Sequence, residues 1–500
     1  TATVSYSLTR SQALGGAICV MAPTEQAIFV ALVNCTFMDC SAQAGMYARG
    51  GAVGVDVPLP ARSRDANTVT RGHIIIEGTT FRACSAVTYE SDASSYPLAQ
   101  STAGGALFVN AGGCPTPIAH LDEQDTCARG ESMVRGDVSL VVVQSFFERC
   151  SVHSRRPNSD TMGGAIHVSG RDLVRTRSVV MTDVSITNCT THALGHAYAG
   201  GMSVWMDAMT SVSAGHHVWQ VNLTRVAISR CLAVSVHKGA AGGAAMFWAA
   251  WYPDVFDEQD TRRVAPLQVI IYGSHFESCN ATSEGGTFDH ALSRGAEGGC
   301  MMSNLPLALP TVTPLMIVNS NFSHCMADTR RDQSHSAAIG GAAGGALAVH
   351  SVMHAAVLIN VSIVDGVARS DGGVAEGGAM SVCGMWLWMR ANEYPSISTS
   401  GEHRRVVIMT GVHIARSLAI STAINDRSLA HGGGAAFGPM RGAWRSIHVH
   451  NSTIFACEVG DGRDVDAFGG GVFVTSADVE IYSSRITRCA SRGNTQGRGG

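Results

Sequence analysis

Short runs of β-branched and apolar residues recur along the whole chain, and polar segments of variable length separate them. Examples are Ile74 to Ile76, Val269 to Ile271 and Val406 to Ile408. Runs of this length and composition are typical of β-strands. No segment of adequate length keeps the apolar period of a helix. The pattern therefore predicts an all-β protein built from many short strands.

A pair of glycines, followed by small or apolar residues, repeats along the chain about every 44 residues. The usual continuation is Gly-Gly-Ala-apolar-x-Val. A glycine pair at a fixed place in a repeat predicts a corner, where a positive φ or a close backbone approach excludes a Cβ atom. The pairs begin at Gly15, Gly50, Gly104, Gly163, Gly200, Gly242, Gly298, Gly344, Gly377, Gly433, Gly470 and Gly499.

A second motif, apolar-x-x-Cys, lies between consecutive glycine pairs. Two units keep its frame without the cysteine, at Ile363 to Gly366 and at Val412 to Ala415. All eleven units carry both motifs in the same order, and such a repeat predicts a solenoid. The cysteines of the motif are Cys40, Cys84, Cys150, Cys189, Cys231, Cys279, Cys325, Cys457 and Cys489.

We expect each unit to form one coil of a parallel β-helix, with strands that pair with the coils above and below. About eleven coils at roughly 4.8 Å each would give a rod on the order of 50 Å long. A β-sandwich with glycine-rich turns is the alternative, but it does not explain identical motifs in every unit. We expect residues 1–500 to form a single continuous β-helix. Since neither end carries a cap, we expect it to be a fragment of a longer chain.

The two motifs together resemble a known repeat signature. Gly-Gly-Ala-Ile/Leu alternating with Phe-x-x-Asn is the repeat of the chlamydial polymorphic outer membrane proteins, and this chain has Phe-x-x-Cys instead. The resemblance covers essentially the whole chain and is to right-handed, pectin-lyase-like parallel β-helices. It implies a surface-exposed adhesion or passenger domain.

Composition and charge narrow the classes of partner. The net charge of −4, with scattered Lys and Arg, gives no electrostatic case for binding nucleic acid. No uncharged apolar stretch reaches the ~18 residues of a membrane-spanning helix, so no membrane span is expected in this window. The 56 glycines have no three-residue period, which excludes collagen.

Nine of the fifteen cysteines share one repeat position and should stack as a ladder. Two interpretations stay open: buried free thiols, or disulfides between neighbouring coils. Cys114 and Cys127 bracket a polar loop that contains proline, and there we expect a local disulfide. No pair of cysteines has the spacing of metal ligands. We therefore predict no metal site and no cofactor.

Seven Asn-x-Ser/Thr sequons exceed the two or three expected for fifteen asparagines, which predicts a glycosylated, secreted protein at the extracellular or cell-surface location. The alternative is that the repeat frame itself favours asparagine, since Asn34, Asn360 and Asn451 share one frame position. The sequons are Asn34, Asn188, Asn222, Asn280, Asn321, Asn360 and Asn451.

No catalytic residues are predicted. The motifs that a polygalacturonase would need are absent, and the carboxylates lie mostly in variable segments, whereas glycoside hydrolysis needs paired carboxylates on one face. The pentapeptide Asp-Glu-Gln-Asp-Thr at 122–126 and 257–261 is open to two interpretations, a weak calcium loop or an inherited solvated loop. His448 and His450 would share one side of a strand, but no third metal ligand is evident.

Two aromatic segments hold Trp248 and Trp251, and Trp386 and Trp388. We expect contact loops there for a protein or carbohydrate ligand; alternatively, these loops fold back over the coil edges. Together the features predict an extracellular structural or adhesive rod that performs no catalysis. The alternative function is a polysaccharide lyase or glycoside hydrolase of the pectin-lyase-like class, which would need a carboxylate or arginine cluster on adjacent coils.

Overall fold

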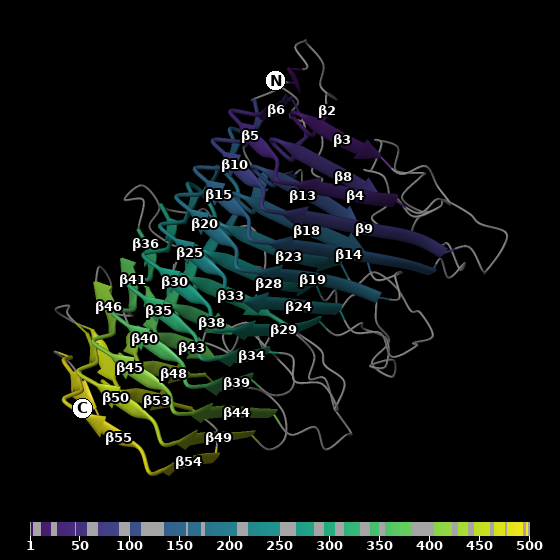
Figure 1. The fold of residues 1–500 in the computed structure, drawn as a ribbon. Coiled ribbons are helices and arrows are strands. Elements are labelled where there is room, and N and C mark those ends of the chain that lie inside the picture. Colours follow the sequence, from purple (N-terminus) through teal and green to yellow (C-terminus); the bar gives the residue numbers. More distant parts are fainter. Residues whose placement is uncertain are drawn as a thin grey trace, which may run out of the picture.

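The computed structural model shows a parallel β-helix of eleven coils, with the two ends of the chain at opposite ends of the stack (Figure 1). Among the described residues no helix is long and apolar enough to cross a membrane. The structure describes residues 2–3, 12–21, 28–45, 47–57, 69–89, 101–111, 135–156, 159–171, 176–207, 219–250, 267–284, 295–305, 315–330, 341–349, 356–371, 373–382, 405–422, 429–438, 445–460, 465–475, 478–493 and 497–498.

Each coil contributes one strand to each of five parallel sheets, which we name B, C, D, E and A in the order the chain visits them. Sheets B and C flank the Gly-Gly corner. Sheet B holds β2 (Gln12–Leu14), β7 (Tyr47–Arg49), β12 (Ser101–Ala103), β17 (Asp160–Met162), β22 (Ala197–Tyr198), β27 (Ala240–Ala241), β32 (Gly295–Glu297), β37 (Gly341–Ala343), β42 (Val374–Glu376), β47 (Leu429–His431), β52 (Asp466–Phe468) and β57 (Gly497–Arg498). Sheet C holds β3 (Ile18–Met21), β8 (Val53–Val57), β13 (Leu107–Ala111), β18 (Ile166–Arg171), β23 (Met202–Asp207), β28 (Ala245–Ala250), β33 (Met301–Asn304), β38 (Leu347–Val349), β43 (Met380–Val382), β48 (Ala435–Phe437) and β53 (Val472–Val474).

Sheets D and E carry the β-branched runs and the Phe/Ile of the second motif. Sheet D holds β4 (Ile28–Val33), β9 (Val69–Glu77), β14 (Arg135–Val143), β19 (Thr176–Thr182), β24 (Trp219–Thr224), β29 (Leu267–Tyr272), β34 (Leu315–Val318), β39 (Ala356–Ile359), β44 (Arg405–Thr410), β49 (Arg445–His450) and β54 (Asp478–Tyr482). Sheet E holds β5 (Thr36–Met38), β10 (Thr80–Arg82), β15 (Phe146–Glu148), β20 (Ser185–Thr187), β25 (Ala227–Ser229), β30 (His275–Glu277), β35 (Asn321–Ser323), β40 (Ser362–Val364), β45 (His413–Ala415), β50 (Thr453–Phe455) and β55 (Arg485–Thr487).

Sheet A follows the cysteine and closes the coil. It holds β1 (Ala2–Thr3), β6 (Ser41–Ala44), β11 (Ser85–Thr88), β16 (Ser151–Ser154), β21 (Thr190–Ala193), β26 (Leu232–Ser235), β31 (Asn280–Ser283), β36 (Met326–Thr329), β41 (Val367–Asp371), β46 (Leu418–Thr422), β51 (Glu458–Val459) and β56 (Ala490–Ser491).

The register of sheet E corrects the sequence prediction for one coil. Ile363 pairs with Ile414, so the motif without cysteine is Ile414 to Ser417 rather than Val412 to Ala415. Ser417 therefore occupies the cysteine position, and its hydroxyl donates a 3.2 Å hydrogen bond to the Ala415 carbonyl. The sequence alone misplaced this unit because Val412 also fits an apolar-x-x-small pattern.

The two glycines of each pair are needed for different reasons. The first has a positive φ, as at Gly163 (62°), and the second has no room for a Cβ atom. A Cβ on Gly164 would lie 2.0 Å from the Gly200 carbonyl oxygen of the next coil. In three coils this frame starts one residue earlier than the predicted pair, at Ala199, Gly432 and Gly469.

The interior has two compartments. Sheets C, D and E enclose the main core, where the Phe/Ile column stacks: Phe81 lies 5.0 Å from Phe37 and 4.7 Å from Phe147, ring centre to ring centre. Sheets A and B enclose only a thin layer of small residues, such as Ala42 and Ala86. Small side chains at these positions let the two sheets approach closely, which is why the coil is narrow on this side.

Candidate functional site

The two repeated motifs meet inside the coil, at a place that we call the waist. The residue after the Gly-Gly pair faces the ladder cysteine of the same coil. A Cβ atom built on Gly434 would lie 3.3 Å from the Cys457 Sγ, and one on Gly471 would lie 3.2 Å from the Cys489 Sγ. In these two coils a larger side chain would meet sulfur, which gives a physical reason for the alanine or glycine that nearly always follows the pair.

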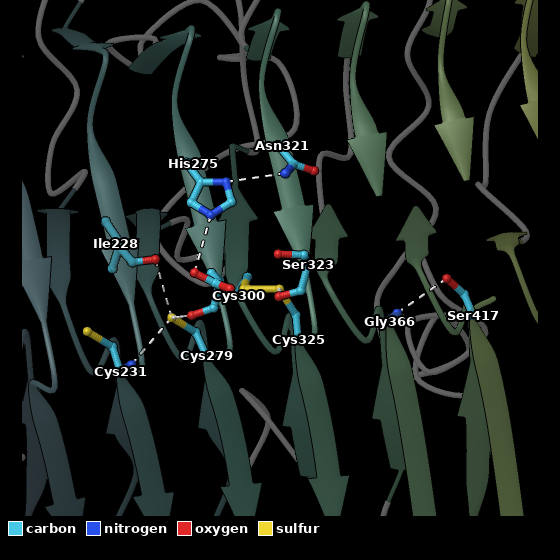
Figure 2. The surroundings of a disulfide bond; sticks show 11 residues. Ile228, Cys231, His275, Cys279, Cys300, Asn321, Ser323, Cys325, Gly366 and Ser417 are labelled. Carbon is cyan, nitrogen blue, oxygen red and sulfur yellow. Dashed lines mark hydrogen bonds and ion pairs between the residues drawn. A yellow bond between two sulfur atoms is a disulfide. The ribbon is translucent and has the colours of Figure 1, made fainter. Parts of the chain in front are cut away.

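The ladder cysteines stack through the rod, and eight of the nine are free thiols with no bond to the next coil. The Cys279 Sγ donates to the Glu277 carbonyl at 3.2 Å and also lies 3.7 Å from the Ile228 carbonyl of the preceding coil (Figure 2). Burial raises the pKa of Cys457 to about 12 and holds the pKa values of Cys189 and Cys231 well above the ordinary value. These thiols stay protonated at neutral pH and are poor nucleophiles.

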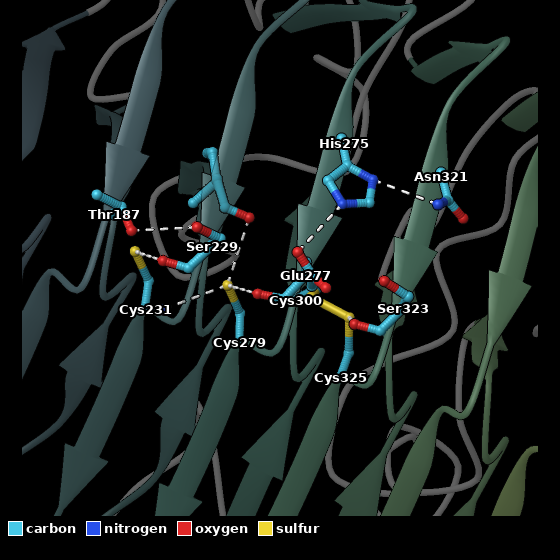
Figure 3. A network of polar contacts seen from close by, with 11 residues as sticks. Thr187, Ser229, Cys231, His275, Glu277, Cys279, Cys300, Asn321, Ser323 and Cys325 are labelled. Atoms are coloured by element: carbon cyan, nitrogen blue, oxygen red, sulfur yellow. Dashed lines mark hydrogen bonds and ion pairs between the residues drawn. A yellow bond between two sulfur atoms is a disulfide. The ribbon is translucent and has the colours of Figure 1, made fainter. Parts of the chain in front are cut away.

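One ladder position is oxidised, in a way that the sequence did not predict. Cys325 forms a disulfide with Cys300, with a Cα–Cα distance of 5.3 Å (Figures 2 and 3). Cys300 stands at the position after the Gly-Gly pair, so the bond crosses the waist of one coil and does not join two coils. The predicted loop disulfide between Cys114 and Cys127 lies outside the described residues, as does Cys383.

The sequons fall at several different positions of the frame. Asn34, Asn360 and Asn451 share the exposed D–E corner with φ near 50°, where Gly78 and Gly411 stand in other coils. Asparagine tolerates this left-handed conformation better than most residues, so the backbone alone gives a reason for it there. The other four are half-buried: Asn188 precedes Cys189, Asn222 and Asn280 lie on strands, and Asn321 donates a 3.3 Å hydrogen bond to the His275 ring (Figure 3).

Trp248 corrects the prediction of an aromatic contact loop. It lies in β28, is 5% exposed, and its ring stacks on Trp205 with ring centres 5.3 Å apart. The strand extends to Ala250. Phe247 belongs to the main core, so the alternation of side chains along the strand places Trp248 on the outer side. Trp251, Trp386 and Trp388 lie outside the described residues.

Metal ligands do not gather in the described part of the chain, where no three His, Cys, Asp or Glu side chains form a possible metal site. His448 and His450 lie on the outer face of sheet D. The His448 Nδ1 is 2.7 Å from a Glu480 carboxylate oxygen, and its Nε2 is 3.0 Å from the Ser446 hydroxyl. Both nitrogens of His448 therefore have protein partners. The Asp-Glu-Gln-Asp-Thr segments at 122–126 and 257–261 lie outside the described residues.

Aromatic, charged and other polar side chains gather instead on the outer side of sheets B and C, on either side of the Gly-Gly corner. We call this surface the B–C face. Here the last residue of a sheet B strand packs beside the second residue of the sheet C strand in the following coil, as Arg49 does with Phe108 and His431 with Phe473. Large side chains from the two sheets pack together in one buried cluster that includes Phe108, Met162, Tyr198, Met246 and Trp248.

Polar groups interrupt this cluster at its N-terminal end. The Arg49 guanidinium carbon lies 5.2 Å from the centre of the Tyr47 ring and 5.1 Å from that of Phe108. Its Nε is buried and makes no hydrogen bond to a described residue. Desolvation lowers the pKa of Arg49, with smaller opposing effects from Tyr47 and Asp56. A guanidinium stays charged in proteins, and no carboxylate in the described part of the chain forms an ion pair with this one.

A chain of hydrogen bonds runs beside Arg49 on sheet C. The Asn110 amide donates to an Asp56 carboxylate oxygen at 2.8 Å, and the Ser169 hydroxyl donates to the Asn110 carbonyl at 3.4 Å. Burial raises the pKa of Asp56, although the Asn110 bond and the Arg49 charge oppose this shift. These hydrogen bonds orient the Asp56 carboxylate toward Asn110 on the neighbouring strand of sheet C.

His167 and Ser203 form a pair that resembles a nucleophile with its base. The His167 Nδ1 and the Ser203 Oγ are 2.7 Å apart, and both residues are buried. Burial, assisted by the Arg49 charge, lowers the pKa of His167 to about 3. A general base works best with a pKa near the operating pH. This histidine is therefore a weak base, and the pair acts as a buried hydrogen bond.

Two carboxylates lie at the C-terminal end of the B–C face. Glu297 and Glu376 occupy the same position of sheet B, two coils apart, with Ala343 between them. The His431 Nδ1 lies 3.9 Å from a Glu376 carboxylate oxygen, and its ring stacks on Phe473 with ring centres 4.3 Å apart. Sequence reasoning missed these residues because none repeats from coil to coil. Aligning the units on the glycine pair would have placed them in one column.

Comparison with protein-family models, with curated proteins and with solved structures finds no match to this chain.

Proposed function

We propose that the protein is an extracellular or cell-surface β-helical rod that binds a partner along the B–C face and performs no catalysis. The observation that carries the proposal is the position of the connections whose length varies from coil to coil. The D–E, E–A and B–C corners have the same length in every coil. By contrast, the segment between sheets C and D is 475–477 in one coil and 112–134 in another.

The segments between sheets A and B vary as well, from 45–46 to 89–100. One variable connection precedes sheet B and the other follows sheet C, so sequence variation concentrates on the two sides of the B–C face. Binding residues on solenoids are commonly carried by such variable segments on a rigid scaffold. The resemblance to chlamydial polymorphic outer membrane proteins and to pectin-lyase-like helices, together with the sequons, supports a secreted adhesive role.

A polysaccharide-cleaving enzyme is the second candidate, and Glu297 with Glu376 is the observation that favours it. Two coils separate their backbones by roughly 9.6 Å, near the ~6.5–9.5 Å between the carboxyl groups of inverting glycosidases. Against this, Glu376 is only 1% exposed and already contacts His431. A buried carboxylate with a histidine beside it has a structural explanation that needs no substrate.

The test compares binding with turnover. Wild-type protein is applied to arrays of extracellular-matrix proteins and glycans, and to a panel of polyuronides. We expect array binding that is lost when segments 112–134 and 383–404 are replaced by short Gly-Ser linkers. Binding should persist in a control with Glu148→Gln and Glu277→Gln on the outer face of sheet E. Polyuronide turnover that Glu376→Gln abolishes would establish the enzyme instead, and binding unaffected by the linkers would contradict the rod proposal.

A further inference from the structure

Arg49 is a charged residue at a position that is otherwise apolar in the N-terminal half of the rod. Its partners in the register of sheet B are Leu14 on one side and Ala103 on the other. The same position holds Met162, Tyr198 and Ala241 in the following coils. A coil therefore forms without a cation there, and the fold gives no reason for this arginine.

The contacts of Arg49 differ from those of arginines that serve the frame. Arg225 donates two hydrogen bonds to Asp183, at 2.7 and 2.8 Å, and Arg416 does the same to Asp365 at 2.8 and 2.9 Å. Arg49 has two aromatic rings beside it instead, and no hydrogen bond or ion pair joins its guanidinium to the described part of the chain.

The nearest carboxylate does not neutralise Arg49. Asp56 interacts with its charge, but no ion pair joins the two side chains, and the Asp56 carboxylate is held by Asn110. Burying a cation without an anion in contact is strongly unfavourable. Residues that break the local rules of a fold in this way are commonly functional.

We propose that Arg49, fixed between Tyr47 and Phe108, binds a carboxylate or sulfate group of an acidic glycan on the B–C face. The guanidinium offers parallel N–H donors that match such an anion. Tyr47 and Phe108 hold the guanidinium in place through their ring contacts, and Asp56 can accept a hydrogen bond from a hydroxyl group beside the anion. The site deepens the proposed function by naming the chemistry of a ligand, and it rests on that proposal for its use of the B–C face.

The experiment measures binding of four probes by calorimetry: hyaluronan, chondroitin sulfate, poly-glutamate and neutral maltohexaose. We expect the two acidic glycans to bind and maltohexaose not to bind. Arg49→Met should weaken glycan binding ~10- to 100-fold, the loss expected for a charge-assisted hydrogen-bonded pair. Arg49→Lys, which keeps the charge without the planar donors, should fall between the two.

Arg369→Met is the matched control, because Arg369 is a half-exposed arginine on sheet A, away from the B–C face. It should bind the glycans within about twofold of wild type. The thermal midpoint of Arg49→Met should equal or exceed that of wild type, since an unpaired cation is replaced by an apolar side chain. A lowered midpoint would show a structural role for Arg49 and overturn the proposal.

Other outcomes also overturn it: no glycan binding at millimolar concentration, equal binding of maltohexaose, preferential binding of poly-glutamate, or equal loss in Arg369→Met. A different result would contradict the broader proposal of a rod that binds through its variable segments. In that case the linker replacements at 112–134 and 383–404 leave array binding intact, whatever Arg49→Met does.

Discussion

Two adjacent residues in the fifth coil should respond to substitution in opposite directions. Ala199 has a φ of 57°, at a position where the other ten coils have glycine. Gly200 is the second residue of the corner, where every coil has glycine. A Cβ atom on Gly200 would lie 2.3 Å from the Leu232 nitrogen, 2.5 Å from the Gly243 oxygen and 2.6 Å from the Leu232 oxygen.

The magnitudes follow from these two environments. A left-handed conformation costs alanine about 1–2 kcal/mol, and glycine returns part of this as unfolded-state entropy, about 0.5–1 kcal/mol. Ala199→Gly should therefore stabilise by about 0.5–1 kcal/mol. In Gly200→Ala the new methyl group clashes with three backbone atoms, and these cannot move away by a change of side-chain rotamer. Overpacking of about 1–3 kcal/mol, plus about 1 kcal/mol for each weakened hydrogen bond of the corner, gives a loss of about 4 kcal/mol.

The assay is urea unfolding followed by circular dichroism, with hydrogen exchange of peptides from 197–207. The local readout matters because coils of a solenoid can open separately. Gly200→Ala should speed exchange in these peptides and leave peptides around 447–459 unchanged. If Gly200→Ala unfolds within about 1 kcal/mol of wild type, which is the scale of an ordinary surface substitution, the close approach of this corner to the Leu232 and Gly243 backbones does not exist.

Three further predictions concern buried groups. Ser303→Ala should raise the free energy of unfolding in urea by about 1 kcal/mol, because the buried Ser303 Oγ has no hydrogen-bond partner among the described residues; an equal loss would contradict this. Cys300→Ala should lower stability by about 3 kcal/mol, because the disulfide closes a loop with a sequence separation of 25, and dithiothreitol should then destabilise wild type but not the variant. Burial and the Arg49 charge lower the pKa of His167 to about 3, so the unfolded chain takes up a proton below pH ~6.5 that the folded chain refuses. Stability should fall by up to about 1.4 kcal/mol per pH unit as pH drops from ~6.5 toward 3, and urea titrations should show a shallower fall in His167→Asn; an identical slope would place the effect elsewhere.

The fold could be predicted because its two motifs repeat in every coil. A position that needs a positive φ and a position that has no room for a Cβ atom are both occupied by glycine. The sequence therefore predicts the corner but does not distinguish the two reasons for glycine. Where a third glycine or Ala199 adjoins the pair, the pattern could not fix the frame to one residue. Strand register settled it, since Ile363 pairs with Ile414 and not with Val412.

The candidate site could not be predicted in the same way. The contact between the two motifs is a property of the cross-section of a coil, and spacing along the chain carries no information about it. Cys300 had no assigned role for this reason, although it stands opposite Cys325 across the waist. Arg49 and His167 each occur once, at repeat positions that hold apolar or small residues in neighbouring coils. A search for repeated features therefore does not find them. Trp248 was misplaced because an aromatic run resembles a contact loop, whereas β28 extends to Ala250 and includes this residue.

The waist can be tested most directly by copying the Cys300–Cys325 bond into another coil. Ala165 stands after its Gly-Gly pair as Cys300 does, and the free, buried Cys189 is the ladder residue of the same coil. In the Ala165→Cys variant, non-reducing peptide mapping should show the introduced cysteine joined to Cys189 after mild oxidation. An introduced cysteine that stays free, or that pairs with Cys150 of the preceding coil, would contradict the claim that the two repeated motifs meet within each coil.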